Sequence, residues 1–557
     1  QASALNSEKP TTGGNVNITS TQGEINATQN IETYSQQGTA GDVNITAAGH
    51  VHTNNILSQG RQQGGDITIN SDSENSIDVV GALKTYSEAG IAGNVRLTSP
   101  GSINIRGIRS EGMEQGGNIQ VNSERGEINS TGNIDSYSDA GRGGNIKVNA
   151  PERVTLGDVS SYGMIESGDL RIQSRKAQVN TGNVKTQAPG GSSGSIIING
   201  RGVGTGDLSS IGTTSAGDID VEATNGSIKT YNIEIKSDGT IGDLRLKATK
   251  NIATEDIDQT AGEGDANANI SSGGNQTTGD INQKADNDTN LNQTAGGDIT
   301  TGDINQNAGN DTDLNQTAGR DITTGDINQN AGNDTNLNQT AGRDITTGDI
   351  NQNAGNDTNL NQTAGRDITT GYINQKADND TNLNQAAGGQ INTPAINQTF
   401  GNESINTQRQ GINQIPDNTL GNYNNNVPNN QVLNQETFGE NNKNNISDNS
   451  TINKSSNPNI LSNQTSELIS ISTPSNKNQT TNTNTAQEPT KSSINNTTPN
   501  PIITTPSQNN QTTNTNTAQE QTESSINSTT DTQEILKTID TINSNPLTVA
   551  TSSDQVI

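Results

Sequence analysis

Residues 279–301 read GDINQKADNDTNLNQTAGGDITT, and residues 302–324 repeat them as GDINQNAGNDTDLNQTAGRDITT. Further copies follow at the same step of 23 residues, beginning at Gly325, Gly348 and Gly371. Three large aliphatic positions keep their places in every copy, and a fixed period of this kind is the signature of a repeat architecture. They form three columns: Ile281, Ile304, Ile327, Ile350 and Ile373; Leu291, Leu314, Leu337, Leu360 and Leu383; and Ile299, Ile322, Ile345, Ile368 and Ile391.

Each aliphatic residue is flanked by polar residues, as in Asp280-Ile281-Asn282, and Ala, Gly, Asn and Asp separate the segments. This pattern is typical of short strands joined by turns, and it lacks the apolar spacing of three and four residues that a helix needs. One copy cannot bury three aliphatics alone. A coil stacked on the next would place Ile on Ile and Leu on Leu at roughly the 4.8 Å strand spacing. The repeat therefore predicts an all-β fold, a right-handed parallel β-helix solenoid with three short faces per coil.

The upstream sequence follows the same pattern with looser spacing, and the downstream sequence does not. Gly, then Asn or Asp, then alternating aliphatics recurs at steps of 23–28 residues from Val16 to Leu244. We therefore expect irregular coils over residues 1–260 and regular coils over residues 261–400. From residue 401, Asn, Gln, Ser and Thr dominate and the aliphatic columns vanish. Such a segment cannot offset its ordering entropy, so residues 401–557 are predicted to be a disordered polar linker.

Composition excludes several classes of function. Only 25% of the 557 residues are hydrophobic, and there is no Trp and no Cys, so a narrow core is expected and thiol chemistry is excluded. The net charge is −29, which argues against nucleic acid and anionic lipid as partners. No apolar run is long enough to insert into a membrane. Gln1 is followed directly by repeat-like sequence without the features of a signal peptide, so we interpret the chain as a mature piece or a fragment.

The coils that begin Gly-Gly-Asn or Gly-Gly-Asp, at Gly13–Ile18, Gly64–Ile69, Gly116–Val121 and Gly143–Val148, resemble filamentous haemagglutinin-type repeats. These repeats belong to large bacterial exoproteins, many of them exported by two-partner secretion. The closest similarity is to cyanobacterial haemagglutinin-like proteins, some of which carry a caspase-like CHAT domain after a polar linker. The resemblance covers about residues 13–400, and it implies a protein that is secreted or at the cell surface, associated with the outer membrane.

Two groups of residues are candidate metal ligands. His50 and His52 would face the same side of a strand and offer half of a metal site, but a solvated pair is the preferred interpretation. A column of aspartates should stack in one turn, where mutual repulsion could be relieved by Ca²⁺. The preferred alternative is that each Asp caps its own turn and stays hydrated, so no cofactor and no metal are predicted. The calcium candidates are Asp288, Asp311, Asp334, Asp357 and Asp380.

Two other sets of side chains are predicted to lie at the surface or at the edge of the core. Asp321, Asp344 and Asp367 each follow an arginine, Arg320, Arg343 and Arg366, which predicts exposed charge ladders. The tyrosines at Tyr34, Tyr86 and Tyr137 either line a sugar-binding face or, as we prefer, cover the end of the narrow core.

The preferred functional hypothesis is a non-enzymatic, monomeric rod that acts in adhesion or as a structural scaffold, with a surface glycan or protein as its partner. The first alternative is a regulatory or sensory stem for a C-terminal caspase-like effector domain. The second is a polysaccharide-active β-helix enzyme, which is disfavoured because no acid, base and substrate clamps cluster in the sequence. We therefore predict no catalytic residues and no cofactor-binding residues.

Overall fold

The computed structural model describes residues 5–9, 11–72, 74, 76–401, 405–411, 413–414 and 432–436 of the chain. The chain divides into two units, residues 1–451 and 452–557, and every described residue lies in the first. The regular secondary structure of these residues consists of strands alone. Within the described part, a search for a helix that is long and apolar enough to cross a membrane finds none.

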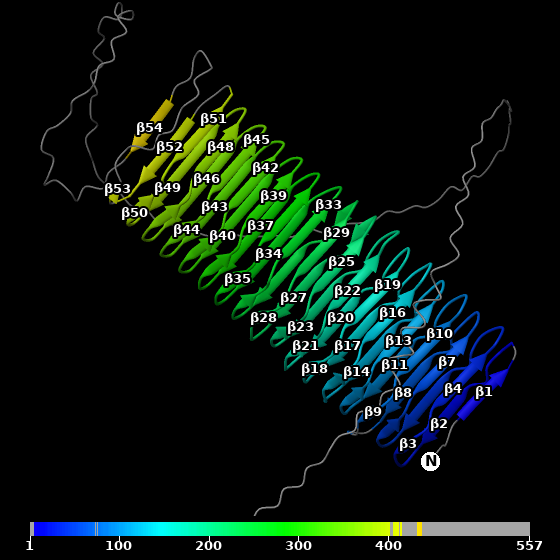
Figure 1. The fold of residues 1–557 in the computed structure, drawn as a ribbon. Helices are drawn as coiled ribbons and strands as arrows, with labels where there is room; N and C mark the ends of the chain where they lie inside the picture. The colour runs from blue at the N-terminus through cyan, green and yellow to red at the C-terminus, as the bar shows by residue number, and fades with distance from the viewer. Residues whose placement is uncertain are drawn as a thin grey trace, which may run out of the picture. The chain divides into compact units, whose positions relative to one another are not determined.

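The strands form three long parallel sheets, and each coil contributes in turn one strand to each sheet (Figure 1). The first sheet consists of β1 (Leu5–Lys9), β4 (Ile31–Ser35), β7 (Ile56–Gly60), β10 (Leu83–Ser87), β13 (Ile108–Gly112), β16 (Ile134–Ser138), β19 (Val159–Gly163), β22 (Val184–Ala188), β25 (Leu208–Gly212), β29 (Ile233–Ser237), β33 (Ile257–Ala261), β36 (Ile281–Ala285), β39 (Ile304–Ala308), β42 (Ile327–Ala331), β45 (Ile350–Ala354), β48 (Ile373–Ala377) and β51 (Ile396–Phe400).

The second sheet consists of β2 (Val16–Ser20), β5 (Val43–Ala47), β8 (Ile67–Ser71), β11 (Val95–Ser99), β14 (Ile119–Ser123), β17 (Ile146–Ala150), β20 (Leu170–Ser174), β23 (Ile196–Gly200), β27 (Ile219–Ala223), β31 (Leu244–Ala248), β34 (Ala266–Ser272), β37 (Thr289–Ala295), β40 (Thr312–Ala318), β43 (Thr335–Ala341), β46 (Thr358–Ala364), β49 (Thr381–Ala387), β52 (Ile405–Gln410) and β54 (Val432–Glu436).

The third sheet consists of β3 (Ile25–Ala27), β6 (Val51–Thr53), β9 (Ile77–Val79), β12 (Ile103–Ile105), β15 (Ile128–Ser130), β18 (Val154–Thr155), β21 (Val179–Asn180), β24 (Val203–Gly204), β28 (Ile228–Lys229), β32 (Ile252–Ala253), β35 (Gln276–Thr278), β38 (Ile299–Thr301), β41 (Ile322–Thr324), β44 (Ile345–Thr347), β47 (Ile368–Thr370), β50 (Gln390–Asn392) and β53 (Asn413–Gln414). A separate short pair joins β26 (Ser215–Ala216) to β30 (Thr240–Ile241).

The predicted aliphatic columns are confirmed by the register of all three sheets. Ile281 pairs with Ile304 in the first sheet, Leu291 with Leu314 in the second, and Ile299 with Ile322 in the third. The chain is therefore a parallel β-helix solenoid, as the repeat predicts. At the usual strand spacing, the first sheet would extend for about 75 Å.

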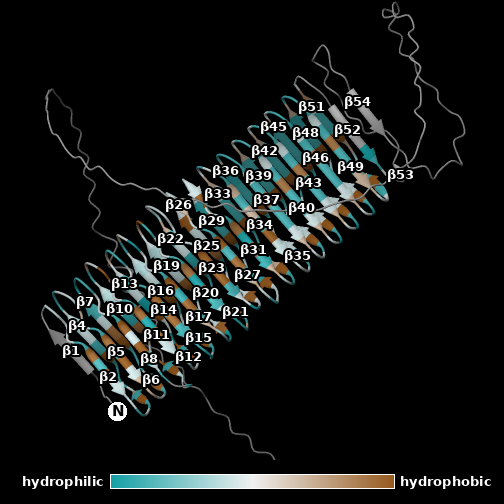
Figure 2. Ribbon diagram, turned by 180° about the vertical axis from the view of Figure 1, so that it is seen from behind, coloured by the Kyte–Doolittle hydropathy of each residue, from teal (hydrophilic) through white to brown (hydrophobic). Residues whose placement is uncertain are grey.

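Side chains alternate between a narrow interior and the outer face of each strand. The inward residues of the first sheet in one regular coil are Ile281, Gln283 and Ala285, and the second and third sheets add Leu291 and Ile299. Figure 2 shows the hydrophobic residues as rows that cross neighbouring strands. Each fully buried Ile or Leu contributes about 1.5–3 kcal/mol relative to an exposed one, so the cohesion of the stack is repeated coil by coil.

The polar residues of the interior differ between the two halves of the stack. In the N-terminal half, a Ser or Thr faces inward in the first sheet, and Thr85 Oγ1 donates to the Gly93 carbonyl at 2.7 Å. From Gln259 onward, this position is a glutamine. Each glutamine donates to the one before it, as Gln306 Nε2 does to Gln283 Oε1 and Gln329 Nε2 to Gln306 Oε1, both at 2.9 Å. The inward polar groups of the first sheet are therefore satisfied by different partners in the two halves of the stack.

Glycine is required where neighbouring turns approach most closely. A Cβ on Gly93 would lie 2.1 Å from the Gly65 carbonyl oxygen, and one on Gly117 would lie 2.0 Å from that of Gly93. Real Cβ contacts are not this short, so the Gly-Gly-Asn and Gly-Gly-Asp signature is explained by the contact between coils.

The structure reaches into the range that we predicted to be a linker. Strands β52, β53 and β54 lie between residues 405 and 436, and they pair with β49, β50 and β52 in the parallel register of the preceding coils. The other residues of the predicted linker, 402–404, 412, 415–431 and 437–557, lie outside the described residues.

Candidate functional site

The five candidate calcium ligands do stack, but their oxygens are used to connect coils. Asp311 donates its backbone N–H to Asp288 Oδ1 at 3.1 Å, and Asp334 and Asp357 do the same to the preceding aspartate at the same distance. Each aspartate of these pairs therefore caps the turn of the next coil, and the expectation that it caps its own turn is wrong. Partial burial, together with the neighbouring aspartates, raises the pKa of Asp334 above its ordinary value.

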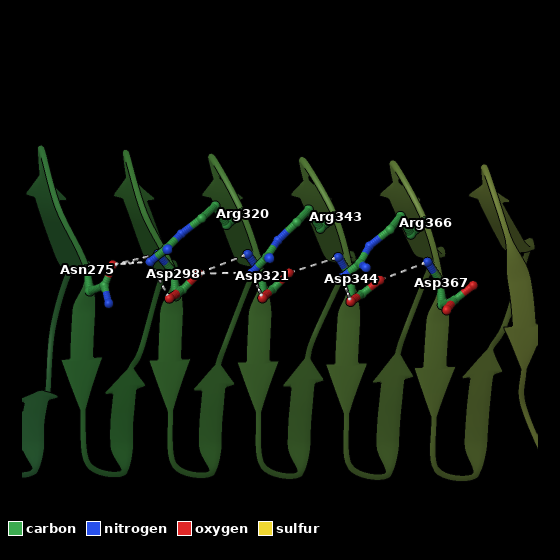
Figure 3. Close-up of polar contacts among 8 residues, drawn as sticks. All are labelled: Asn275, Asp298, Arg320, Asp321, Arg343, Asp344, Arg366 and Asp367. Atoms are coloured by element: carbon green, nitrogen blue, oxygen red, sulfur yellow. Dashed lines mark hydrogen bonds and ion pairs between the residues drawn. The ribbon is translucent and has the colours of Figure 1, made fainter.

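The arginine column forms the predicted exposed charge ladder, with a direction that the sequence did not indicate (Figure 3). Arg320 Nη2 lies 2.6 Å from Asp298 Oδ2, in the preceding coil, and 2.9 Å from Asn275 Oδ1. In the same way, Arg343 pairs with Asp321, and Arg366 with Asp344. Each arginine thus neutralises a carboxylate of the previous coil rather than the aspartate that follows it in sequence.

Replacing Arg343 by alanine is expected to lower the free energy of unfolding by less than about 1 kcal/mol, because both partners are partly exposed and screened by solvent. Urea unfolding at low and high salt would measure this. The small loss should shrink further as salt rises, and a loss that is large and independent of salt would contradict the exposed-ladder interpretation.

The outer face of the first sheet carries a stripe of aromatic and charged side chains. Tyr137 and Tyr162 are register partners with ring centroids 4.8 Å apart. Lys84 Nζ lies 4.7 Å from the centroid of the Tyr86 ring, and the Arg109 guanidinium lies 5.6 Å from that of Tyr137. The prediction that tyrosines cover the end of the core is therefore wrong: the residues that flank Tyr34, Tyr86 and Tyr137 on each side point inward.

Glu111 connects this stripe between Tyr86 and Tyr137. Its Oε2 lies 3.1 Å from Lys84 Nζ and 3.0 Å from Arg109 Nε. Partial burial opposes ionisation, but the two cations outweigh it and lower the pKa of Glu111. The Tyr137 hydroxyl donates to Asp139 at 2.8 Å, which, with burial, raises the pKa of Tyr137 to about 12. The Tyr86 and Tyr137 rings are thus each in contact with a cation that also pairs with Glu111.

The same face becomes an amide-lined groove in the regular coils. A shallow groove of about 660 Å³ runs over the strands from β33 to β51. Its floor holds two ladders of asparagines: Asn305 donates to Asn282 at 2.9 Å, and Asn330 donates to Asn307 at 3.0 Å. Half of each amide's hydrogen-bonding capacity is used within a ladder, so the remainder can bind a polar ligand.

A third group lies on the outer face of the third sheet. His50 and His52 lie on the same side, as predicted, with ring centroids 6.4 Å apart. Asp78, in the next coil, joins them: it is the register partner of His52, and its Oδ2 lies 3.2 Å from His50 Nε2. Among the described residues, this is the group of three or more potential metal ligands whose ligand atoms all lie within 4.8 Å of one another.

Sequence reasoning did not find Asp78, Glu111 or the buried glutamines. The buried glutamine column could have been predicted, because Gln283 lies two residues after the inward Ile281 and recurs with the same period of 23 residues. Asp78 lies 26 residues after His52, one irregular coil length, so a register drawn over the loose coils would have paired them.

The fold and these faces define the described part of the chain as a parallel β-helix with a repetitive polar surface. Comparison with known proteins adds no family to this description: no family model, no curated protein and no solved structure matches the chain.

Proposed function

We propose that this chain is a non-enzymatic adhesive rod, secreted or displayed at a cell surface, and that the outer face of the first sheet binds a glycan. The observation that carries the proposal is the continuity of that face. The fourth residue of each first-sheet strand forms one column that includes Tyr86, Glu111, Tyr137 and Tyr162 and, further along the stack, Asn307 and Asn330. One face therefore offers aromatic rings and then a row of amides.

The chemistry of this face suits a neutral polysaccharide. Tyrosine rings give flat apolar surfaces with a polar edge, and amides both donate and accept hydrogen bonds, which suits a ligand covered in hydroxyl groups. The chain's net charge of −29 disfavours a polyanionic ligand. Because the same contacts recur along the stack, a polymer can engage several of them at once, and weak single contacts add to a useful avidity.

The test is retention of the full chain on a panel of immobilised neutral and acidic polysaccharides. The double variant Tyr137→Ala/Tyr162→Ala is expected to bind a neutral polysaccharide about tenfold more weakly, because two stacking surfaces are lost. Val80→Ala is the control: Val80 is 53% exposed and directly follows β9 of the third sheet, away from the proposed glycan face, so binding should not change.

Three results would contradict the proposal. Absence of retention across the neutral panel, or equal retention of the double variant and the control, would rule out the first-sheet face as a glycan site. Release of new reducing ends from a polysaccharide, including a polyuronate, would remove the non-enzymatic part and favour the enzyme alternative.

A further inference from the structure

The coil geometry brings together three residues that the sequence keeps apart. His50 precedes β6 and His52 lies within it, while Asp78 lies at the centre of β9, one coil further on. All three side chains are partly exposed on the outer face of the third sheet. They are therefore accessible to an ion from solvent, yet their backbones are fixed by the parallel pairing of β6 with β9.

The separation between His50 and Asp78 matches that of neighbouring ligands on one metal ion. Zinc binds imidazole nitrogen and carboxylate oxygen at about 2.0–2.2 Å, so two ligands at angles between 90° and tetrahedral lie about 2.9–3.4 Å apart. His50 Nε2 and Asp78 Oδ2 are 3.2 Å apart. One ligand atom from each of the three residues lies within 4.8 Å of the other two, so rotation of the His52 side chain would have to close at most about 1.4 Å to reach tetrahedral geometry.

Neighbouring groups hold the first two ligands in this orientation. Ser76 Oγ lies 2.9 Å from His50 Nδ1, and Asn104 Nδ2 donates to Asp78 Oδ1 at 2.7 Å, which leaves Oδ2 directed at His50. A serine hydroxyl both donates and accepts, so it can bond to Nδ1 in either imidazole tautomer. Such outer partners orient the imidazole and carboxylate of metal sites.

We propose that His50, His52 and Asp78 form a binding site for a divalent transition-metal ion, with Zn²⁺ as the best-suited ion. The two imidazoles are borderline ligands that favour Zn²⁺ and its neighbours over Ca²⁺ or Mg²⁺, and a carboxylate is an accepted further ligand of zinc. Three protein ligands leave a fourth position for water or for a ligand from a partner. The inference is independent of glycan binding, because the site lies on a different sheet from the proposed glycan face.

The bound ion would join two adjacent coils near the N-terminal end of the stack. In a solenoid, each coil contacts only its neighbours, so a cross-link between β6 and β9 stabilises that interface specifically. The expected consequence is that Zn²⁺ slows proteolysis of the first coils without changing cleavage of the regular repeats.

The test uses the full chain with any affinity tag removed, isothermal titration with ZnCl₂, and NMR of histidines labelled at Cε1. The chain contains 2 histidines and no cysteine, so the spectrum holds one signal from each imidazole and no thiolate competes. We expect stoichiometric binding of one ion, with both signals shifting together. Asp78→Asn should weaken binding at least tenfold, and Ca²⁺ should shift neither signal.

Glu124→Gln is the matched control, because it removes one exposed carboxylate elsewhere on the surface and should leave the affinity unchanged. A shift of only one histidine signal, or an equal affinity for Asp78→Asn and Glu124→Gln, would overturn the three-residue site. Failure of Zn²⁺ to bind the wild-type chain would overturn it as well, whatever the variants do.

Discussion

Ile322→Asp is expected to lower the free energy of unfolding by at least about 4 kcal/mol, whereas Thr323→Asp, one residue further on, should change it by less than about 1 kcal/mol. Ile322 is fully buried between Ile299 and Ile345, so the variant loses an aliphatic side chain and places a carboxylate in the narrow core. Thr323 points outward in the same strand and is exposed. Urea unfolding followed by circular dichroism measures both.

This pair also tests the phase of the strand. The two variants add the same charge at adjacent positions, one on the inner face of the strand and one on the outer face. Equal losses would mean that the strand has no fixed inner face. The opposite order would mean that the register is shifted by one residue, which exchanges the two faces.

Gln329→Glu should lower the free energy of unfolding by about 3–5 kcal/mol at neutral pH, although the side chain hardly changes in size. Gln329 is 2% exposed and donates to Gln306 Oε1 and to the Asn336 carbonyl, while it accepts from Gln352 Nε2. A carboxylate can still accept from Gln352. It cannot donate, so it faces two oxygens that have lost their donor.

The loss of stability caused by Gln329→Glu should depend on pH, and it should become smaller as the pH falls. Burial disfavours the charged form, so the pKa of the introduced carboxyl is raised in the folded chain above its unfolded value of about 4.3. The folded state therefore binds the proton more tightly. The penalty is complete above the folded pKa, shrinks as pH falls, and is largely gone below about pH 4. The difference from wild type should narrow accordingly in urea unfolding at descending pH.

The matched control for this prediction is Asn330→Asp, the next residue along β42. Asn330 is exposed and donates to Asn307 in the outer ladder, so a charge there stays solvated and should cost about 1 kcal/mol or less, with little change between neutral and mildly acidic pH. The prediction would be contradicted if Gln329→Glu lost no more stability than Asn330→Asp, or if its loss grew on acidification. Either result would mean that the glutamine column is not a buried ladder whose members depend on donated hydrogen bonds.

The fold could be predicted from the sequence because the regular repeat fixes the register arithmetically. Once Ile281, Ile304 and Ile327 recur at a constant step, stacking places them in one column, and the structure has them there. The same period-two logic applied to Ile31-Glu32-Thr33-Tyr34-Ser35 would have placed Tyr34 outside, since Ile31 points inward. The prediction about the tyrosines was wrong because it considered the size of the side chain and not its place in the inward–outward alternation of the strand.

The candidate sites were less predictable, because they depend on pairs formed between coils. Asp78 meets His52 only through a coil of irregular length, and Arg343 reaches back to Asp321 rather than to the adjacent Asp344. Such contacts depend on the rise from one coil to the next and on the direction of the side chain, and the local sequence specifies neither. Where the turn length varies, the register has to be known before the partner can be named.

Spin-label distances along the third sheet test the stacked register most directly. The chain has no cysteine, so Lys229→Cys/Thr346→Cys and Thr155→Cys/Thr346→Cys would label only the chosen outward positions. Five register steps separate the first pair and eight the second. Pulsed electron paramagnetic resonance should give narrow distance distributions near 24 Å for the first pair and 38 Å for the second, about 4.8 Å per coil. Broad distributions, or a separation that does not grow by about three strand spacings between the pairs, would contradict the solenoid.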